Sequence, residues 1–199
     1  MIDATILSVF LLLPIAGALL AWVLPERNNA HKTISVTVSL GLLAAAVLLV
    51  IQAITVQKAG FILRERIPLL PEWGIAWHVG VDGLSIAMLF LSALVQFAAS
   101  VVAAPNGRVR AYHSLVQLLF VGVNGTFLAL DMVFFYVFWE IMLIPMFFLI
   151  AIWGGDDRKR AAVKFFLYTM TGSVAMLLAM LVLHFQIPAA GITIPVRTA

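Results

Sequence analysis

Long apolar runs, separated by short polar segments, dominate the chain. A helix needs about 20 mostly apolar residues to cross a bilayer. Runs of about this length occur at residues 4–24, 34–56, 84–104, 112–130, 132–153 and 161–185. The pattern predicts an all-α polytopic membrane protein with about six transmembrane helices. We expect the first helix to be retained, because Asp3 stands where a signal peptide carries basic residues.

Residues 112–153 form one apolar stretch that is about twice as long as a single span needs. Asp131 interrupts this stretch. An ionised carboxylate in hydrocarbon is costly, so we expect Asp131 at a tight interfacial turn that separates two helices.

A longer polar connection follows the second run and contains two alternating stretches, at residues 61–67 and 73–79. Pro68 and Pro71 separate them. Alternation bounded by proline is typical of strands, so we expect a short β-hairpin at about 61–79, on the outer face of the membrane.

The chain is thereby divided into three parts. We expect residues 1–111 to hold helices 1–3 with the hairpin, and residues 112–185 to hold helices 4–6 as the first part of a repeat. Residues 186–199 are predicted to form a loop-like tail.

Basic residues predict the orientation, because cytoplasmic loops carry an excess of Lys and Arg. With six helices, one side holds eight basic residues: Arg27, Lys32, Arg108, Arg110, Arg158, Lys159, Arg160 and Lys164. The other side holds four: Lys58, Arg64, Arg66 and Arg197. We therefore expect a multi-pass protein of the bacterial plasma (inner) membrane, with both termini on the outer, periplasmic face.

Composition excludes several other classes of protein. The chain is 64% hydrophobic and 11% charged, with a mean hydropathy of +1.12, whereas soluble domains are about 45–50% apolar and 25% charged. A soluble globular domain, a disordered chain and a nucleic-acid binder are therefore excluded. The sequence has no cysteine, which excludes disulfides, thiolate metal sites and cysteine nucleophiles. Its four histidines show no metal-ligand spacing.

Glu140 is the main candidate functional residue, because it lies in the middle of the fifth predicted span. An acidic residue there costs roughly 2.5–3.5 kcal/mol on insertion scales and must face the protein interior or water. A carboxyl group in such a site changes its proton affinity when a nearby cation moves. We interpret Glu140 as a proton-relay carboxylate; a structural acid that bonds a neighbouring helix is the alternative.

Pro145 and Lys164 are supporting candidates. Pro145 frees the carbonyl of Ile141, next to Glu140, and favours a kink with a hydration site, although proline also serves packing in membrane helices. Lys164 lies about one turn inside the sixth span, either as an interfacial anchor or as part of a longer polar path. The expected register places residue 175 opposite Glu140, which leaves Lys164 about 15 Å away along the axis.

The remaining polar residues of the spans have simpler interpretations. We expect Thr169, Thr171 and Ser173 to serve close helix packing, with water binding as the alternative. Three amides are expected in interhelical hydrogen bonds: Gln96, Gln117 and Asn124. His113 is expected at the membrane interface.

Three segments carry a family resemblance: VGVDGLS at residues 79–85, FFYVFWEIMLIPM at 134–146 and AAVKFFLYT at 161–169. They resemble the antiporter-like subunits of proton-pumping NADH:quinone oxidoreductase (respiratory complex I), and among these the M chain. The resemblance implies a membrane-arm subunit that contributes part of a proton path, coupled to electron transfer from NADH to quinone elsewhere in the complex. It also implies that this chain carries no redox catalysis. We expect no cofactor or metal here, with NADH, FMN, iron–sulfur clusters and quinone in other subunits.

In this family the fifth-helix glutamate, which corresponds to Glu140, works with a lysine on a broken seventh helix. Inverted repeats form their ion site at a shared interface. We therefore expect the later helices and that lysine to come from another chain or from a longer protein, and the partners to be other membrane-arm subunits and the lipid bilayer, with no nucleic acid. The alternatives are a subunit of a multisubunit cation/proton antiporter or membrane-bound hydrogenase, and a non-transporting structural remnant of such a subunit.

Overall fold

The computed structural model describes residues 5–23, 30–56, 60–70, 75–102 and 109–189. These residues form the helices α1 (Thr5–Val23), α2 (Ala30–Val56), α3 (Gly83–Val101), α4 (Val109–Leu128), α5 (Met132–Trp153) and α6 (Arg158–Ala189). Two strands, β1 (Leu63–Leu70) and β2 (Ile75–Val81), lie between α2 and α3 in the sequence. Each predicted apolar run therefore coincides with one helix.

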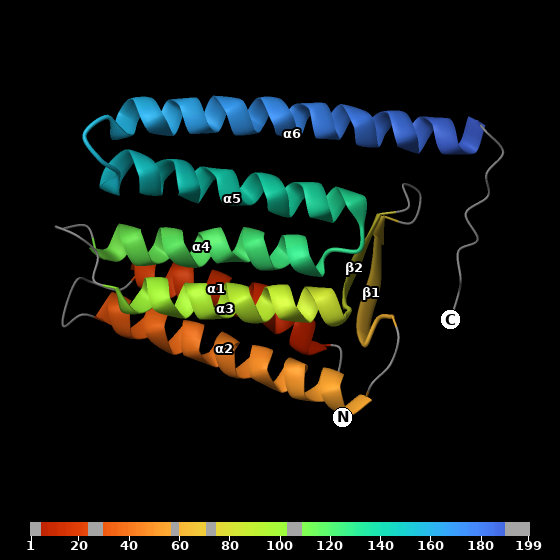
Figure 1. Cartoon of the computed structure of the whole chain (residues 1–199), viewed down its shortest axis with the longest axis horizontal. Coiled ribbons are helices and arrows are strands. Elements are labelled where there is room, and N and C mark those ends of the chain that lie inside the picture. Colours follow the sequence, from red (N-terminus) through yellow and green to blue (C-terminus); the bar gives the residue numbers. More distant parts are fainter. Residues whose placement is uncertain (1–4, 24–29, 57–59, 71–74, 103–108, 190–199) are drawn as a thin grey trace.

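The helices run side by side, with the two-stranded sheet across one end of the bundle (Figure 1). α4 is the central helix, because α1, α2, α3 and α5 all pack against it. α6 lies at the edge of the bundle and packs against α5 (Figure 1). We call the end with the sheet the hairpin end, and the opposite end, where Lys32, Arg110 and Arg158 lie in the first turns of their helices, the basic end.

Aspartates start two helices at the hairpin end. Asp82 accepts a hydrogen bond from the backbone N–H of Ser85 at 2.8 Å, at the start of α3. This bond lowers the pKa of the Asp82 carboxyl below its usual value. Asp131 accepts from the N–H of Val133 at 2.9 Å and of Phe134 at 3.3 Å, and so caps α5. The tight turn predicted at Asp131 is confirmed, and it spans residues 129–131.

α6 is longer than predicted at both ends. It begins at Arg158, because the connection after α5 takes only residues 154–157. It also continues through residues 186–189, which were predicted as the start of the loop-like tail. Gln186 and Ile187 are compatible with a helix, so the apolar run does not mark its end. The rest of the predicted tail, residues 190–199, lies outside the described residues, as do Arg27, Lys58, Arg108 and Arg197.

The hairpin is antiparallel, with Leu63 opposite Val81 and Leu70 opposite Ile75. Its strands begin two residues later than predicted. Pro68 was expected between the strands but lies inside β1, opposite Ala76. β1 has β2 as its partner on one side, so a residue without an N–H is tolerated on this edge strand.

The hairpin packs on the turn between α4 and α5. The Leu130 N–H donates to the His78 carbonyl oxygen at 2.9 Å. The Trp77 ring makes edge-on contacts with Phe134 and Phe138, with centroid distances of 5.4 and 6.2 Å. These contacts fix the start of α5, which carries Glu140.

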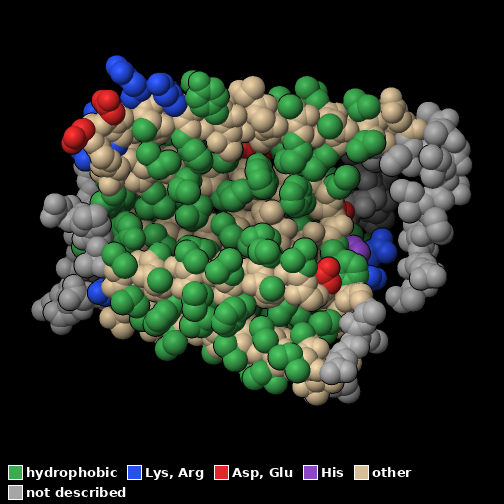
Figure 2. All heavy atoms as spheres, in the orientation of Figure 1, with side chains coloured by type: hydrophobic (Ala, Val, Ile, Leu, Met, Phe, Trp, Pro, Cys, Tyr) green, Lys and Arg blue, Asp and Glu red, His purple; other side chains and the backbone are tan. Residues whose placement is uncertain are grey.

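The outer surface of the bundle is apolar. Hydrophobic side chains cover the middle of the face shown in Figure 2, and charged side chains gather mainly at its ends. α2, α3, α5 and α6 are each long and apolar enough to cross a bilayer. α1 has the shorter apolar helix Leu7–Val23, and α4 holds the polar residues His113, Gln117 and Asn124 in the interior.

Glycines let α4 and α5 approach closely. A Cβ atom on Gly122 would lie 2.8 Å from the carbonyl oxygen of Phe138 and 2.9 Å from the backbone nitrogen of Met142. A Cβ atom on Gly125 would meet the Phe138 ring. Small residues allow such backbone contact between membrane helices.

Gly122→Ala should therefore destabilise the bundle by about 1–3 kcal/mol, because the added methyl group meets the backbone of α5. The measurement is thermal unfolding of the chain in lipid nanodiscs. Gly172→Ala on α6 is the matched control, because nothing lies within 4 Å of its added methyl group. Equal unfolding temperatures for the two variants would show that the α4–α5 contact is looser than described.

Candidate proton-relay site

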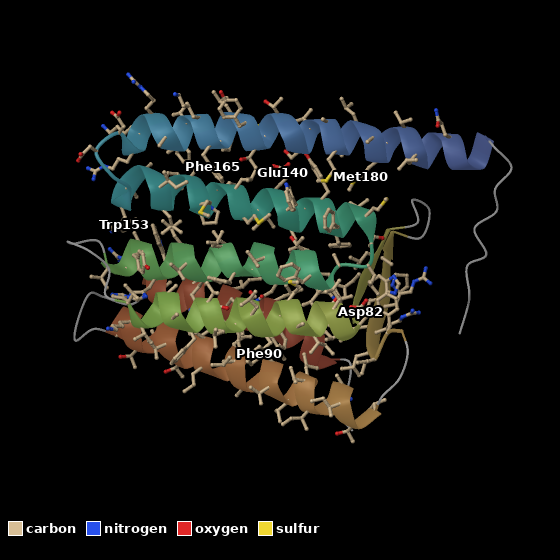
Figure 3. The ribbon with its side chains drawn as sticks, in the orientation of Figure 1. Asp82, Phe90, Glu140, Trp153, Phe165 and Met180 are labelled. Atoms are coloured by element: carbon tan, nitrogen blue, oxygen red, sulfur yellow. The ribbon has the colours of Figure 1, made fainter. Side chains whose placement is uncertain are left out.

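Glu140 lies in the interior of α5, and its side chain points toward α6 (Figure 3). The residue is half-buried. Its carboxyl oxygen Oε1 is buried and has no hydrogen-bond partner within the described residues. The carboxyl group therefore lies between two apolar helices with hydrogen-bonding capacity to spare.

Tyr136 and Ser173 complete a polar group at this position. Tyr136 lies one helical turn before Glu140 on the same face, and its hydroxyl lies within interaction range of Glu140 and of Ser173 on α6. Ser173 is buried, and its hydroxyl donates to the Met170 carbonyl at 3.0 Å. Tyr136 was not predicted from the sequence as a site residue. Its spacing of four residues from Glu140 indicates a position on the same helix face.

Pro145 is buried inside α5, and the helix continues past it to Trp153. Proline has no N–H, so the Ile141 carbonyl lacks its usual helical donor. Ile141 directly follows Glu140 and is partly buried. A backbone acceptor therefore lies beside the carboxyl group, as the sequence predicts.

The register between α5 and α6 differs from the expected one. The Tyr136 hydroxyl interacts with Ser173, and the ring centroids of Phe147 and Phe166 are 5.8 Å apart. These pairs place residues 169–173, rather than 175, opposite Glu140, because α6 begins at Arg158 instead of 161.

This register places Lys164 about 8–13 Å from Glu140 along the axis, nearer than the predicted 15 Å. Lys164 is exposed in the second turn of α6. Within the described residues, no ion pair joins it to Glu140.

The other polar residues of the spans form local or interhelical hydrogen bonds. Thr169 and Thr171 donate to carbonyls of their own helix, each at 2.7 Å. The predicted interhelical bonds are confirmed: Gln96 donates to Gln117 at 2.7 Å, and Asn124 accepts from Ser92 at 2.7 Å.

His113 lies near the start of α4, at the basic end, and is fully buried among the helices. Among the described residues, no group of three or more His, Asp or Glu could hold a metal ion.

The hairpin end has its own titratable group. Burial and the nearby Arg66 and Arg64 lower the pKa of His78, which Asp131 raises to a smaller extent. The His78 imidazole is therefore neutral at pH 7. It lies on β2, outside the helices, and is not part of the Glu140 site.

Comparison with known proteins adds an independent line of evidence. Residues 129–193 match the family described as NADH:quinone oxidoreductase/Mrp antiporter, TM. NAD(P)H-quinone oxidoreductase chain 4 of Gloeobacter violaceus is 35% identical over 181 residues, which are 90% of this chain and 34% of that protein. The chain is similar to M-type, antiporter-like subunits of these oxidoreductases. It spans about a third of the length of the curated relatives it matches.

Chains of solved respiratory membrane complexes are also similar to this chain. A chain of respiratory complex I from Thermus thermophilus with bound NADH matches with a TM-score of 0.72 and 32% identity, over 88% of this chain and 35% of that chain. A chain of the membrane-bound sulfane sulfur reductase, an archaeal respiratory membrane complex, matches with a TM-score of 0.74 and 24% identity, over 91% of this chain and 28% of that chain. The second likeness shows a shared fold alone.

The Tyr136 hydroxyl should contribute to stability by joining α5 to α6. We expect Tyr136→Phe to lower the free energy of unfolding by about 1 kcal/mol, the typical net value of a hydrogen bond. Tyr168→Phe is the matched control, because Tyr168 is 78% exposed on α6. Thermal unfolding in nanodiscs tests both variants; if Tyr136→Phe unfolds like the wild type, Tyr136 does not join the helices.

Proposed function

We propose that the chain is part of a membrane-arm subunit of a proton-translocating NADH:quinone oxidoreductase, with Glu140 as a proton-relay carboxylate. The half-buried Glu140 carboxyl, with one oxygen left unpartnered between apolar helices, carries the proposal. Intramembrane acids are functional by default, because the bilayer penalises them. Electron transfer from NADH to quinone, with its flavin and iron–sulfur clusters, takes place in other subunits.

The local geometry supports proton exchange at Glu140. Tyr136 donates to the carboxylate form, and the Ile141 carbonyl supplies an acceptor next to it. A cation that approaches from another helix favours the charged carboxylate, and its withdrawal favours the protonated acid. Lys164, about 8–13 Å away along the axis, belongs to a longer polar path rather than to a direct pair.

All six helices cross the membrane in this proposal. α4 is less apolar than the others, yet it is central and its polar side chains face other helices instead of lipid. The Lys and Arg bias then places the basic end in the cytoplasm, and the hairpin end with both termini in the periplasm. In this proposal the lysine partner of Glu140 lies on a helix of another chain or of a longer form of this protein.

A subunit of a multisubunit cation/proton antiporter is the second candidate, favoured by the family match at residues 129–193, whose description includes the Mrp antiporter. Proton exchange at Glu140 serves this function equally well. Quinone reduction by the purified assembly distinguishes the two.

Glu140→Gln should keep the fold but lower proton pumping by the assembled complex at least about tenfold, because an amide cannot exchange a proton at this site. Pumping is measured with a pH-sensitive dye in vesicles that contain the intact complex. Asp156→Asn removes an exposed acid from the loop before α6 and should leave pumping unchanged. Wild-type pumping by the Glu140→Gln complex would refute the assignment.

The orientation is testable by labelling, because the chain has no cysteine of its own. Arg64→Cys in the hairpin should react with a membrane-impermeant maleimide added to the periplasmic side. Asp156→Cys, at the opposite end of the bundle, should react only after the membrane is opened. The reverse pattern would invert the proposed topology.

A further inference from the structure

A second polar system lies in the bundle, away from Glu140. The buried face of α2 begins at the basic end with polar residues: His31, Ser35 and Ser39. The same face continues toward the hairpin end with apolar residues: Leu42, Ala46 and Leu49. The spacing of three or four residues keeps them on one side of the helix. The buried face of α2 therefore changes from polar to apolar part-way along its length.

The buried face of α3 also changes from polar to apolar toward the hairpin. Its polar residues come last in the sequence, because α3 runs from the hairpin end to the basic end. Its buried face is polar toward the basic end, at Ser100, Gln96 and Ser92, and apolar at Leu89 and Ile86 near the hairpin. α4 contributes His113, Gln117 and Asn124, followed by the buried Leu128. We call the polar parts of these three buried faces the polar seam.

Hydrogen bonds join the seam across all three helices. Ser35 donates to Ser100 at 3.0 Å, and the hydroxyls of Ser39 and Ser100 are 2.8 Å apart. The Gln117 amide donates to the Ser35 hydroxyl at 2.9 Å and accepts from Gln96 at 2.7 Å. α2, α3 and α4 therefore share one network.

The seam also has buried polar atoms that the protein leaves unpaired. Both ring nitrogens of His31 and of His113, Gln96 Oε1 and Asn124 Nδ2 have no hydrogen-bond partner within the described residues. These side chains are at most 2% exposed. Unsatisfied buried groups cost about 1–3 kcal/mol each, and buried water commonly satisfies such groups. The unpaired atoms occur along the whole seam, from the histidines at the basic end to Asn124.

The seam is closed at its inner end. Leu49, Leu89 and Leu128 belong to the apolar core that lies between the seam and the hairpin. From His113 to Asn124 the seam extends about 16 Å along α4, which is about half of the hydrocarbon thickness of a bilayer.

We propose that the polar seam binds a chain of water molecules, which gives protons access from the basic end to the depth of Asn124. The two imidazoles lie at its mouth, where their unpaired ring nitrogens can bind water. The seam is separate from the Glu140 site, because Glu140 faces α6 while the seam is shared by α2, α3 and α4. The proposal does not depend on the proposed function.

The test uses a single thiol as a probe of water in this cysteine-free chain. Ser39→Cys places the thiol in the seam, and Ala46→Cys places it on the same face of α2, two helical turns further, in the apolar part. The full chain in lipid bilayers is transferred to D2O, and infrared spectroscopy follows conversion of S–H to S–D. A thiol exchanges only where water reaches it.

We expect the Ser39→Cys thiol to exchange at least about tenfold faster than the Ala46→Cys thiol, which exchanges only through opening of the bundle. Ser100→Cys and Leu89→Cys repeat the comparison on α3 if an α2 variant fails to fold. Equal rates for the seam thiol and the apolar thiol would overturn the proposal, whether both are fast or both are slow.

A second pair of variants tests the direction of access. His113→Phe, made in the Ser39→Cys background, should slow thiol exchange to the rate of the apolar control, because a phenyl ring blocks the mouth of the seam. His113→Gln keeps a polar side chain there and should preserve fast exchange. If exchange in the His113→Phe variant stays fast, water does not come from the basic end and the proposed path is wrong.

Discussion

The structure depends on one constraint: a polar side chain inside a bilayer must find its partners within the protein. α4 shows the consequence most clearly. Gln117 is fully buried, and its amide is bonded by residues of α2 and α3. A helix with this composition is stable in a membrane only when other helices surround it, so its polar residues place α4 at the centre. The packing of α1, α2, α3 and α5 around it follows from that requirement.

The same constraint applies differently to α5 and α6, because fewer of their residues are buried against other helices. They are less buried than α2 and α3, with only 17% and 6% of their most apolar segments buried. Glu140 is the exception on α5, and it points toward the single neighbour that α5 has on that side, α6 (Figure 3). Tyr136 interacts with this carboxyl group, and Oε1 has no hydrogen-bond partner within the described residues.

Much of this arrangement could be predicted from the sequence, because hydrophobicity and charge act over short stretches. The length of each apolar run predicted a helix, and Asp131 predicted the turn between α4 and α5. Exact registers were not predictable in this way. α6 begins three residues earlier than its apolar run, and this shift brings residues 169–173 opposite Glu140. Pro68 lies within β1 because β1 is an edge strand, where a residue without an N–H is tolerated.

The polar seam escaped prediction for a related reason. Ser35, Ser39 and Ser100 are ordinary residues in membrane helices, and each is compatible with simple packing. Their significance appears only when three helices place them at the same depth, next to Gln96 and Gln117. A residue-by-residue search favours charged side chains such as Glu140 and cannot detect a network made of neutral ones.

The two polar systems are kept apart by the α4–α5 contact. Phe138 packs directly on Gly125, and Gly122 lies against the backbone of α5, so no layer of side chains separates the two helices there. A proton that moved from Asn124 toward Glu140 would have to cross this dry contact. Separating α4 from α5 would break this close packing. It would also disturb Trp77, whose ring contacts the Phe138 ring. In this chain, therefore, exchange between the seam and Glu140 requires either movement of α5 relative to α4 or a route through helices outside the chain.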